Sequence, residues 1–176
     1  PLPSLFTFAL EASWLIPCSG ISVNNASLKL CLDNQSFEQF GRVLLTHWGL
    51  SGPAVLRMTS FAARALHSYQ YKAILNVNWL GIINPKIVRQ TLKEYRYKEA
   101  RKTISNARPF PELSKKLWLA ILQQVGINPL VKWADFTASY ENRLLNALVS
   151  SDYMIRGKGP FGEEFVTAGG VNLKNV

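Results

Sequence analysis

The residues of this sequence best suited to chemistry lie in one short run, Leu44-Leu45-Thr46-His47-Trp48-Gly49-Leu50-Ser51-Gly52-Pro53. The run has the pattern of a strand end, a glycine-bearing turn and a helix start, and Pro53 suits the first turn of a helix. Ser51 is placed to cap that helix, whose N–H groups and dipole favour an anion or a developing negative charge. His47 lies a few residues upstream, where an imidazole can donate or accept a proton. The run is therefore a candidate site.

The same run also has a purely structural interpretation. The glycines would form the turn, Ser51 would cap the helix, and His47 would make a buried hydrogen bond. Residues of these types more often serve such roles than catalytic ones, so without other observations the structural interpretation is favoured.

Two glycine-rich segments later in the sequence bear on nucleotide binding. Gly157-Lys158-Gly159-Pro160-Phe161-Gly162 has the form GxGxxG, which binds a pyrophosphate where a strand leads into a helix. Here Pro160 removes a donor, Glu163 and Glu164 would repel phosphate, and strand-like residues follow, so we predict a hairpin loop. Val166-Thr167-Ala168-Gly169-Gly170-Val171 is a strand running into a glycine pair, which lets a backbone approach a flat ligand closely or simply turns the chain.

The formal net charge of +9 is concentrated in the middle of the chain. Lys86, Arg89, Lys93 and Arg96 recur at spacings of three and four, which places them on one stripe of a helix. Nucleic-acid binding needs such charge, but no recognised RNA or DNA motif accompanies it, and a solvated helix face is the common alternative. We therefore do not expect nucleic acid as the main partner.

The composition argues against several other classes of protein. No uncharged apolar run of about 18 residues is present, so we expect no membrane-spanning helix. Two cysteines and two histidines cannot supply a convincing four-ligand zinc site, so we expect no metal. Cys18 and Cys31 occur among strand-like residues, and we interpret both as reduced core thiols of a cytoplasmic protein. No Ser/His/Asp triad or carboxylate pair can be assembled with any specificity.

Hydrophobic periodicity predicts the elements that position these residues. From Ser4 to Trp79 the pattern is mostly of period two, typical of half-buried strands. A strand around Leu28–Leu32 and a second over 37–45 are joined by a turn signal at 33–35, which predicts a hairpin. The other elements predicted in this part are a helix from about Gly52 to His67 and a strand over 71–79.

From Asn84 to Ser150 the period becomes helical, and prolines and glycines mark the joints. Asn84-Pro85 starts one helix, Pro109 and Pro111 separate it from a second, and a third runs over about 137–149. A strand pattern returns after Ser151. The residues therefore predict an α+β fold in which a β subdomain is interrupted by a helical insertion.

Two of these segments in combination make the sequence recognisable. The run from Leu44 to Pro53, followed by Ala54-Val55-Leu56, and the later run from Val166 to Val171 together resemble the BaiN/YhiN-type, aminoacetone oxidase-like FAD-dependent oxidoreductases. Pro3-Ser4-Leu5 also looks like that family's entry into this region. In that family a Rossmann-type FAD domain is split in sequence, and the region between its halves is a β-barrel-like unit carrying a helical bundle.

The resemblance implies a fold and a domain organisation. The fold would be α+β, with an antiparallel β-barrel-like subdomain over 1–80 and 151–176 interrupted by a small helical bundle over 81–150. The chain would be the inserted, substrate-covering region alone, without the FAD-binding halves. A start at Pro1 without an initiator Met fits the expectation of a piece of a longer protein.

The resemblance also implies partners and site residues. The longer protein would move a hydride between NAD(P)H and a small-molecule substrate through FAD, and its FAD-binding domain would contact this chain. The chain alone is expected neither to hold FAD nor to be active. His47 is then expected to be catalytic and Ser51 and Gly52 to bind substrate, while the expected cofactor contacts are Thr167, Ala168, Gly169 and Gly170.

An alternative of a different class stays open. The chain could be a stand-alone basic interaction module that binds RNA or an acidic protein partner through the stripe between Lys86 and Lys102. Salt-dependent binding to nucleic acid would favour that alternative.

Overall fold

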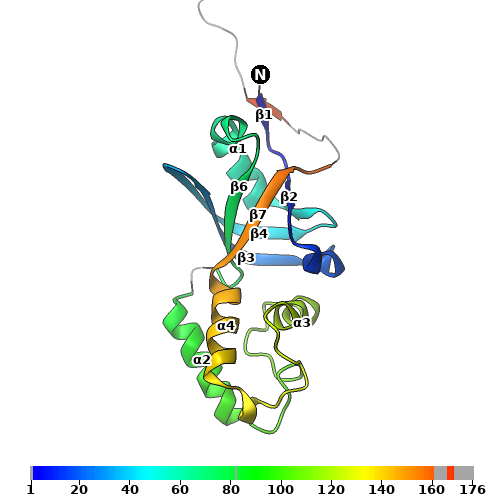
Figure 1. Cartoon of the computed structure of the whole chain (residues 1–176), viewed down its shortest axis with the longest axis vertical. Helices are drawn as coiled ribbons and strands as arrows, with labels where there is room; N and C mark the ends of the chain where they lie inside the picture. Colours follow the sequence, from blue (N-terminus) through cyan, green and yellow to red (C-terminus); the bar gives the residue numbers. More distant parts are fainter. Residues whose placement is uncertain (1, 82, 161–165, 169–176) are drawn as a thin grey trace, which may run out of the picture.

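The computed structural model describes residues 2–81, 83–160 and 166–168 of the chain. Figure 1 shows two parts along the long axis. One is a β-barrel with helix α1 (Pro53–Ser68) beside it, and the other contains α2 (Pro85–Lys98), α3 (Lys115–Gln124) and α4 (Ala138–Val149). The predicted α+β fold, with an antiparallel barrel interrupted by helices, is confirmed.

The barrel is closed and antiparallel throughout. Its strands, in spatial order, are β2 (Phe8–Leu10), β5 (Gly49–Ser51), β4 (Gln35–Leu45), β3 (Ser22–Leu32), β6 (Ala73–Asn78) and β7 (Ser151–Lys158). Pairing of β7 with β2 closes the circle, with Phe8 opposite Lys158. Strands β6 and β7 are neighbours, with Val77 opposite Ser151, so the chain leaves the barrel for the helices and returns in the adjacent strand.

Alternating residues explain why these segments form a barrel. Leu28 and Leu30 of β3 face the interior and are fully buried, while Lys29 between them faces out and pairs with Glu38 of β4 at 3.0 Å. The β3–β4 hairpin and the strand at Ala73–Asn78 are therefore confirmed. Closure satisfies the edge groups that an open sheet would expose.

Helix α1 packs on the barrel through one apolar stripe. Its buried face includes Met58 and Thr59, and the Thr59 hydroxyl oxygen accepts the Phe6 N–H at 3.1 Å. The predicted helix and the place of Pro53 in its first turn are confirmed. The predicted capping role of Ser51 is wrong, because Ser51 belongs to β5 and the N-cap residue is Gly52, which has no side chain to bond.

The three helices begin where the sequence places capping residues. The side chains of Asn84, Ser114 and Thr137 accept backbone N–H groups at the starts of α2, α3 and α4. Helix α2 ends at Lys98, well before the prolines that were expected to separate it from α3. The intervening segment is held by two buried indoles, since Trp118 and Trp133 donate to the carbonyls of Ile104 and Ala107 at 3.0 and 2.9 Å.

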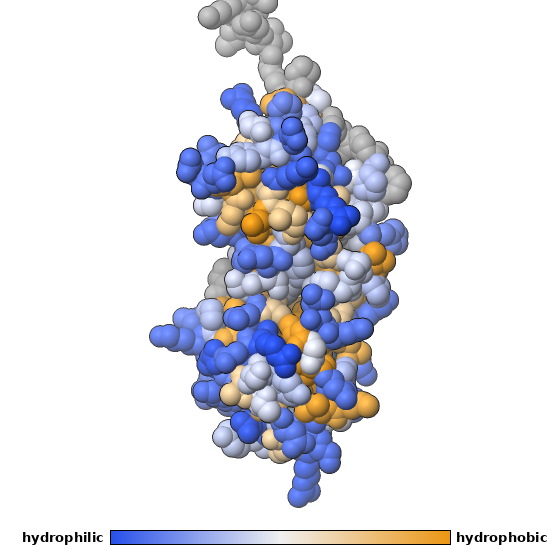
Figure 2. Space-filling view, viewed as in Figure 1, coloured by the Kyte–Doolittle hydropathy of each residue, from blue (hydrophilic) through white to orange (hydrophobic). Residues whose placement is uncertain are grey.

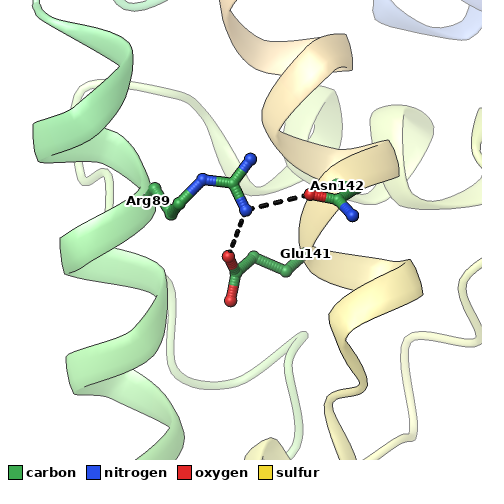
Figure 3. A network of polar contacts seen from close by, with 3 residues as sticks. All are labelled: Arg89, Glu141 and Asn142. Carbon is green, nitrogen blue, oxygen red and sulfur yellow. Dashed lines mark hydrogen bonds and ion pairs between the residues drawn. The ribbon is translucent and has the colours of Figure 1, made fainter.

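A polar contact joins α2 to α4 (Figure 3). One Arg89 guanidinium nitrogen lies 2.6 Å from a carboxylate oxygen of Glu141 and 2.9 Å from the side-chain oxygen of Asn142. Glu141 is buried, so its charge depends on this partner. Arg89 is therefore engaged inside the helical part rather than standing free in the predicted basic stripe.

A short ribbon lies outside the barrel. Strand β1 (Leu2–Ser4) pairs antiparallel with β8 (Val166–Ala168), with Pro3 opposite Thr167. Leu5, at φ +57°, turns the chain from this ribbon into the barrel. The described residues do not form the hairpin predicted around Gly157–Gly162, because β7 pairs with β6 and β2 whereas β8 pairs with β1. Phe161 and Gly162 of the predicted loop lie outside the described residues.

The two cysteines differ from the prediction. Cys18 is buried, but in the 3₁₀ helix η1 (Ser13–Cys18) rather than in a strand. Cys31 does lie in a strand, yet on the outer face of β3, where it is exposed. The interpretation of Cys31 as a core thiol is therefore wrong. Side chains alternate between the two faces of a strand, and the leucines on either side of Cys31 in β3 face the barrel interior.

Candidate functional site

The predicted site run begins with a tight turn between β4 and β5. The Thr46 N–H donates to the Gly49 carbonyl at 2.9 Å, and the Gly49 N–H donates to the Thr46 hydroxyl at 3.1 Å. Gly49 adopts φ +155°, and a β-carbon there would lie 2.2 Å from the Phe8 carbonyl oxygen of β2. Only glycine fits so close an approach. The turn therefore presents His47 and Trp48 at its tip.

Trp48 fixes this tip against β2. Its indole N–H donates to the Thr7 hydroxyl at 3.2 Å, and its carbonyl accepts the Leu10 N–H at 2.8 Å. The His47 ring meets the Trp48 ring edge to face, with centroids 6.1 Å apart. His47 is exposed, so the buried hydrogen bond of the structural interpretation is not its role.

His47 lines a half-open pocket of about 430 Å³ between the turn and η1. The pocket also receives Glu11 and Arg156, whose carboxylate oxygen and guanidinium nitrogen are 2.7 Å apart. Both of these side chains are largely exposed, so their ion pair stabilises the fold little and its groups remain open to a ligand. The remaining lining residues are Leu10, Ala12, Ser13, Leu15, Ile16, Thr46, Trp48 and Gly49. The pocket thus offers an imidazole, a cation and a carboxylate to a small polar molecule.

Ser51 and Gly52 do not line this pocket. Ser51 pairs with Leu44 in the barrel. Gly52 adopts φ +98°, and a β-carbon there would lie 2.9 Å from the Leu44 backbone nitrogen and 3.0 Å from the Arg42 carbonyl oxygen. Close backbone packing therefore accounts for Gly52, and a role of either residue in substrate binding stays a prediction.

The predicted cofactor contacts lie elsewhere. Thr167 and Ala168 belong to β8, opposite Pro3 and Leu2. Gly169 and Gly170 fall outside the described residues. Figure 1 places the β1–β8 ribbon at the end of the molecule opposite the helical part and away from η1. Residues of η1 line the His47 pocket. The structure therefore groups His47 with Glu11 and Arg156, and not with Thr167.

The family model described as HI0933-like protein barrel and H2TH domain matches residues 2–166. The chain belongs to the HI0933-like family. This family belongs to the BaiN/YhiN-like flavoproteins, so the resemblance found in the sequence is confirmed. The closed barrel of this chain corresponds to the barrel in the description of the family model. The region of α2 to α4 then corresponds to its H2TH domain.

HI0933-like membership associates the chain with FAD, but its described residues do not fit a dinucleotide site. Such a site needs parallel strands joined by a helix whose start receives the pyrophosphate. Every strand pairing in residues 2–81, 83–160 and 166–168 is antiparallel. Gly157 and Lys158 of the GxGxxG match lie inside β7, paired with β2, rather than before a helix.

The described residues form neither a metal cluster nor a membrane-spanning helix. Over the part of the chain that the structure describes, no three His, Cys, Asp or Glu side chains gather as a metal site would require. Over the same part, the helices are too short or too polar for any of them to span a bilayer.

Sequence reasoning missed Glu11 and Arg156. They lie 145 residues apart and meet only because β2 pairs with β7 when the barrel closes. No local pattern marks either residue, so only knowledge of the strand order could have joined them. In this member of the HI0933-like family closure of the barrel therefore forms the pocket. Of the residues expected to act in catalysis, substrate binding or cofactor contact, His47 is the one that lines it.

Proposed function

We propose that this chain is the substrate-covering insert domain of a flavoprotein oxidoreductase, with FAD held by sequence on either side of it. The observation that carries the proposal is the match of the HI0933-like family model over residues 2–166. In the proposed whole protein, FAD supplies hydride transfer between NAD(P)H and a small-molecule substrate. The insert comprises a barrel unit, 1–80 and 151–176, and a helical unit, 81–150.

The β1–β8 ribbon supports insertion into another domain. Two antiparallel strands carry the chain toward the barrel and away from it side by side. The hydrogen bonds between Thr59 of α1 and the backbone of Phe6 tie the entering strand to the barrel. A neighbouring domain joined to both strands would therefore hold the barrel in a defined orientation, as domain insertions do where chain ends lie close together.

An apolar row on the outside of the barrel also supports a neighbouring domain. Cys31, Ile74 and Met154 face one another across β3, β6 and β7, and all three are exposed. Figure 2 shows orange side chains gathered over the barrel where Figure 1 draws β6 and β7. Contiguous apolar surface of this kind marks contact with another protein surface.

Within the proposed protein, His47 handles a proton of the substrate. Its imidazole is exposed at the tip of a hydrogen-bonded turn, where a substrate can reach it. Arg156 and Glu11 beside it would orient a polar substrate. We further propose that Ser51 and Gly52 contact substrate and that Thr167 to Gly170 approach the cofactor where the neighbouring domain meets the ribbon.

The first test uses the longer protein that contains this chain. His47→Ala should lower turnover at least about a hundredfold, the low end for losing a general acid or base, without changing thermal stability. His67→Ala is the matched control, because His67 is also exposed but lies in the last turn of α1, outside the pocket. Equal turnover in the two variants would remove His47 from the site.

The second test separates the insert role from the role of His47. The 176-residue chain mixed with FAD should retain no flavin after gel filtration, while the longer protein should elute yellow. The exposed Cys31 thiol should react with a thiol reagent in the chain and be protected in the longer protein. A longer protein with no flavin, or with Cys31 equally reactive, would contradict the insert role.

A further inference from the structure

An apolar groove on the helical part lies outside the proposed flavoprotein site. It has a volume of about 680 Å³ and is formed by one face of α3 and the loop that follows. Lys115, Leu119 and Gln123 recur every four residues on that face. The loop contributes the segment 126–130, and Ser105 completes the lining. In Figure 2 the helical half likewise shows apolar side chains at its surface among hydrophilic ones.

The loop wall of the groove is rigid. Gly126 adopts φ +68° just after α3, and the Ile127 N–H donates to the Leu122 carbonyl at 2.9 Å, which closes the helix end. The Asn128 side chain accepts the Leu130 N–H at 2.9 Å. This turn holds Leu130 outward, where 73% of it is exposed. Together with the apolar groove beside it, this exposed leucine forms an apolar surface of the kind that contacts a partner.

Two basic side chains lie at the groove. Lys115 is the charged residue of the lining, and no ion pair joins it to an acid in the described chain. Arg143 lies beside Gly126, where its guanidinium donates to the Val125 carbonyl at 2.6 Å. The helical part as a whole, residues 81–150, has twelve basic and five acidic residues, a net charge of +7.

The position of Lys115 is unfavourable for the isolated helix. Lys115 and Lys116 begin α3, whose first turn contains no acid. The positive end of a helix dipole repels cations there. A carboxylate docked at this end would interact favourably with both the lysines and the dipole.

We propose that this groove binds an acidic, amphipathic helical segment of a partner protein. Apolar side chains of the segment would cover Leu119, Pro129 and Leu130, and its carboxylates would face Lys115 and Arg143. Helices with apolar residues spaced by three and four fit grooves of this kind. The inference does not depend on the flavoprotein role, because the groove lies on α3 and not on the barrel.

The test uses a fluorescein-labelled peptide of about fifteen residues as the probe, long enough for an amphipathic helix, with leucines at helical spacing and glutamates elsewhere. Fluorescence anisotropy with the 176-residue chain should show saturable binding that weakens with added salt. The same peptide with lysine in place of each glutamate should not bind. Amide NMR shifts in the chain should concentrate at 115–130.

Three variants make the test specific. Leu130→Glu should weaken peptide binding at least about tenfold, equivalent to about 1.4 kcal/mol. Ile87→Glu is the matched control, since Ile87 is 59% exposed on α2 and the added charge is the same. Its affinity should stay within about twofold, a few tenths of a kcal/mol. Lys115→Glu should also weaken binding while leaving the melting temperature unchanged or higher, because an acid suits the start of α3.

Several results would overturn the proposal. One is equal affinity of the Leu130→Glu and Ile87→Glu variants for the peptide. The others are amide NMR shifts confined to α2 and no binding of the glutamate peptide to the chain. Alternatively, the chain could bind a single-stranded RNA and not the peptide, with RNA binding lost in the Lys115→Glu variant. That result would assign the groove to nucleic acid and would equally overturn the proposal.

Discussion

The contact between Arg89 and Glu141 should be a main link between α2 and α4. Glu141 is almost fully buried, and its carboxylate is 2.6 Å from the Arg89 guanidinium (Figure 3). Arg89→Met keeps most of the side-chain volume but leaves the buried carboxylate without its cation. Breaking a fully buried pair costs about 3–5 kcal/mol. Since 40% of the Arg89 side chain is exposed and solvent screens it, we expect a smaller loss, about 2 kcal/mol.

The assay is urea unfolding followed by tryptophan fluorescence. Trp118 and Trp133, two of the five tryptophans, lie in the helical part, so a share of the emission reports on that part. For a chain of this size, a loss of about 2 kcal/mol corresponds to a fall in melting temperature of about 4–8 °C. Lys93→Met is the control, because it removes the same charge from an exposed position of α2 and should cost less than about 0.5 kcal/mol.

A double-mutant cycle decides whether the energy belongs to the pair. If it does, Arg89→Met should lower the free energy of unfolding much less in a chain that already carries Glu141→Gln, because no buried charge then loses its partner. Equal losses in the Arg89 and Lys93 variants, or an additive cycle, would refute the reasoning. Arg89 would then return to the basic stripe as a free surface charge.

Three further predictions concern backbone fit, pH and thiol chemistry. Gly52→Ala should lower the free energy of unfolding, measured in urea, by about 1–3 kcal/mol. Gly52 has φ +98°, which strains any other residue, and the added β-carbon would lie only 2.9 Å from the Leu44 backbone nitrogen. Burial raises the pKa of Tyr153 from its ordinary value of 10.0 to about 12. The neutral phenol therefore stabilises the fold below pH 10, and this contribution is lost as the pH rises toward 12. The Tyr153→Phe variant should therefore lose less stability than the parent between pH 8 and pH 11 in the same assay. With a thiol reagent at pH 8, Cys31 should react at once and Cys18 only on unfolding, because burial raises the pKa of the Cys18 thiol; simultaneous reaction would contradict the structure.

Periodicity and capping residues predicted the parts of the fold that are locally determined. The β3–β4 hairpin follows from alternation at Leu28–Leu32 and the turn after it. Helices α2 and α4 begin at Asn84 and Thr137 because these side chains bond the first free N–H groups. Such signals act over a few residues, so they can be read without knowing the strand order.

The rest depends on contacts distant in sequence. Helix η1 has neither a period of two nor a helical period, and it forms where the barrel and α3 leave room for it. The pairing of β8 with β1 and the meeting of Glu11 with Arg156 each join the two ends of the chain. Local propensity says nothing about such pairs, because their energy arises only when the barrel closes.

Closure also changes what the candidate run means. The two glycines of the Thr46–Pro53 run are required by backbone atoms of Phe8 and Leu44, whatever the chain does chemically. Any chemistry of the run therefore rests on His47, whose neighbours come from η1 and β7. Because the ribbon and the helical groove lie on different parts of the molecule, a flavin domain at one and an acidic segment at the other could bind together. Failure of either experiment would leave the other proposal standing.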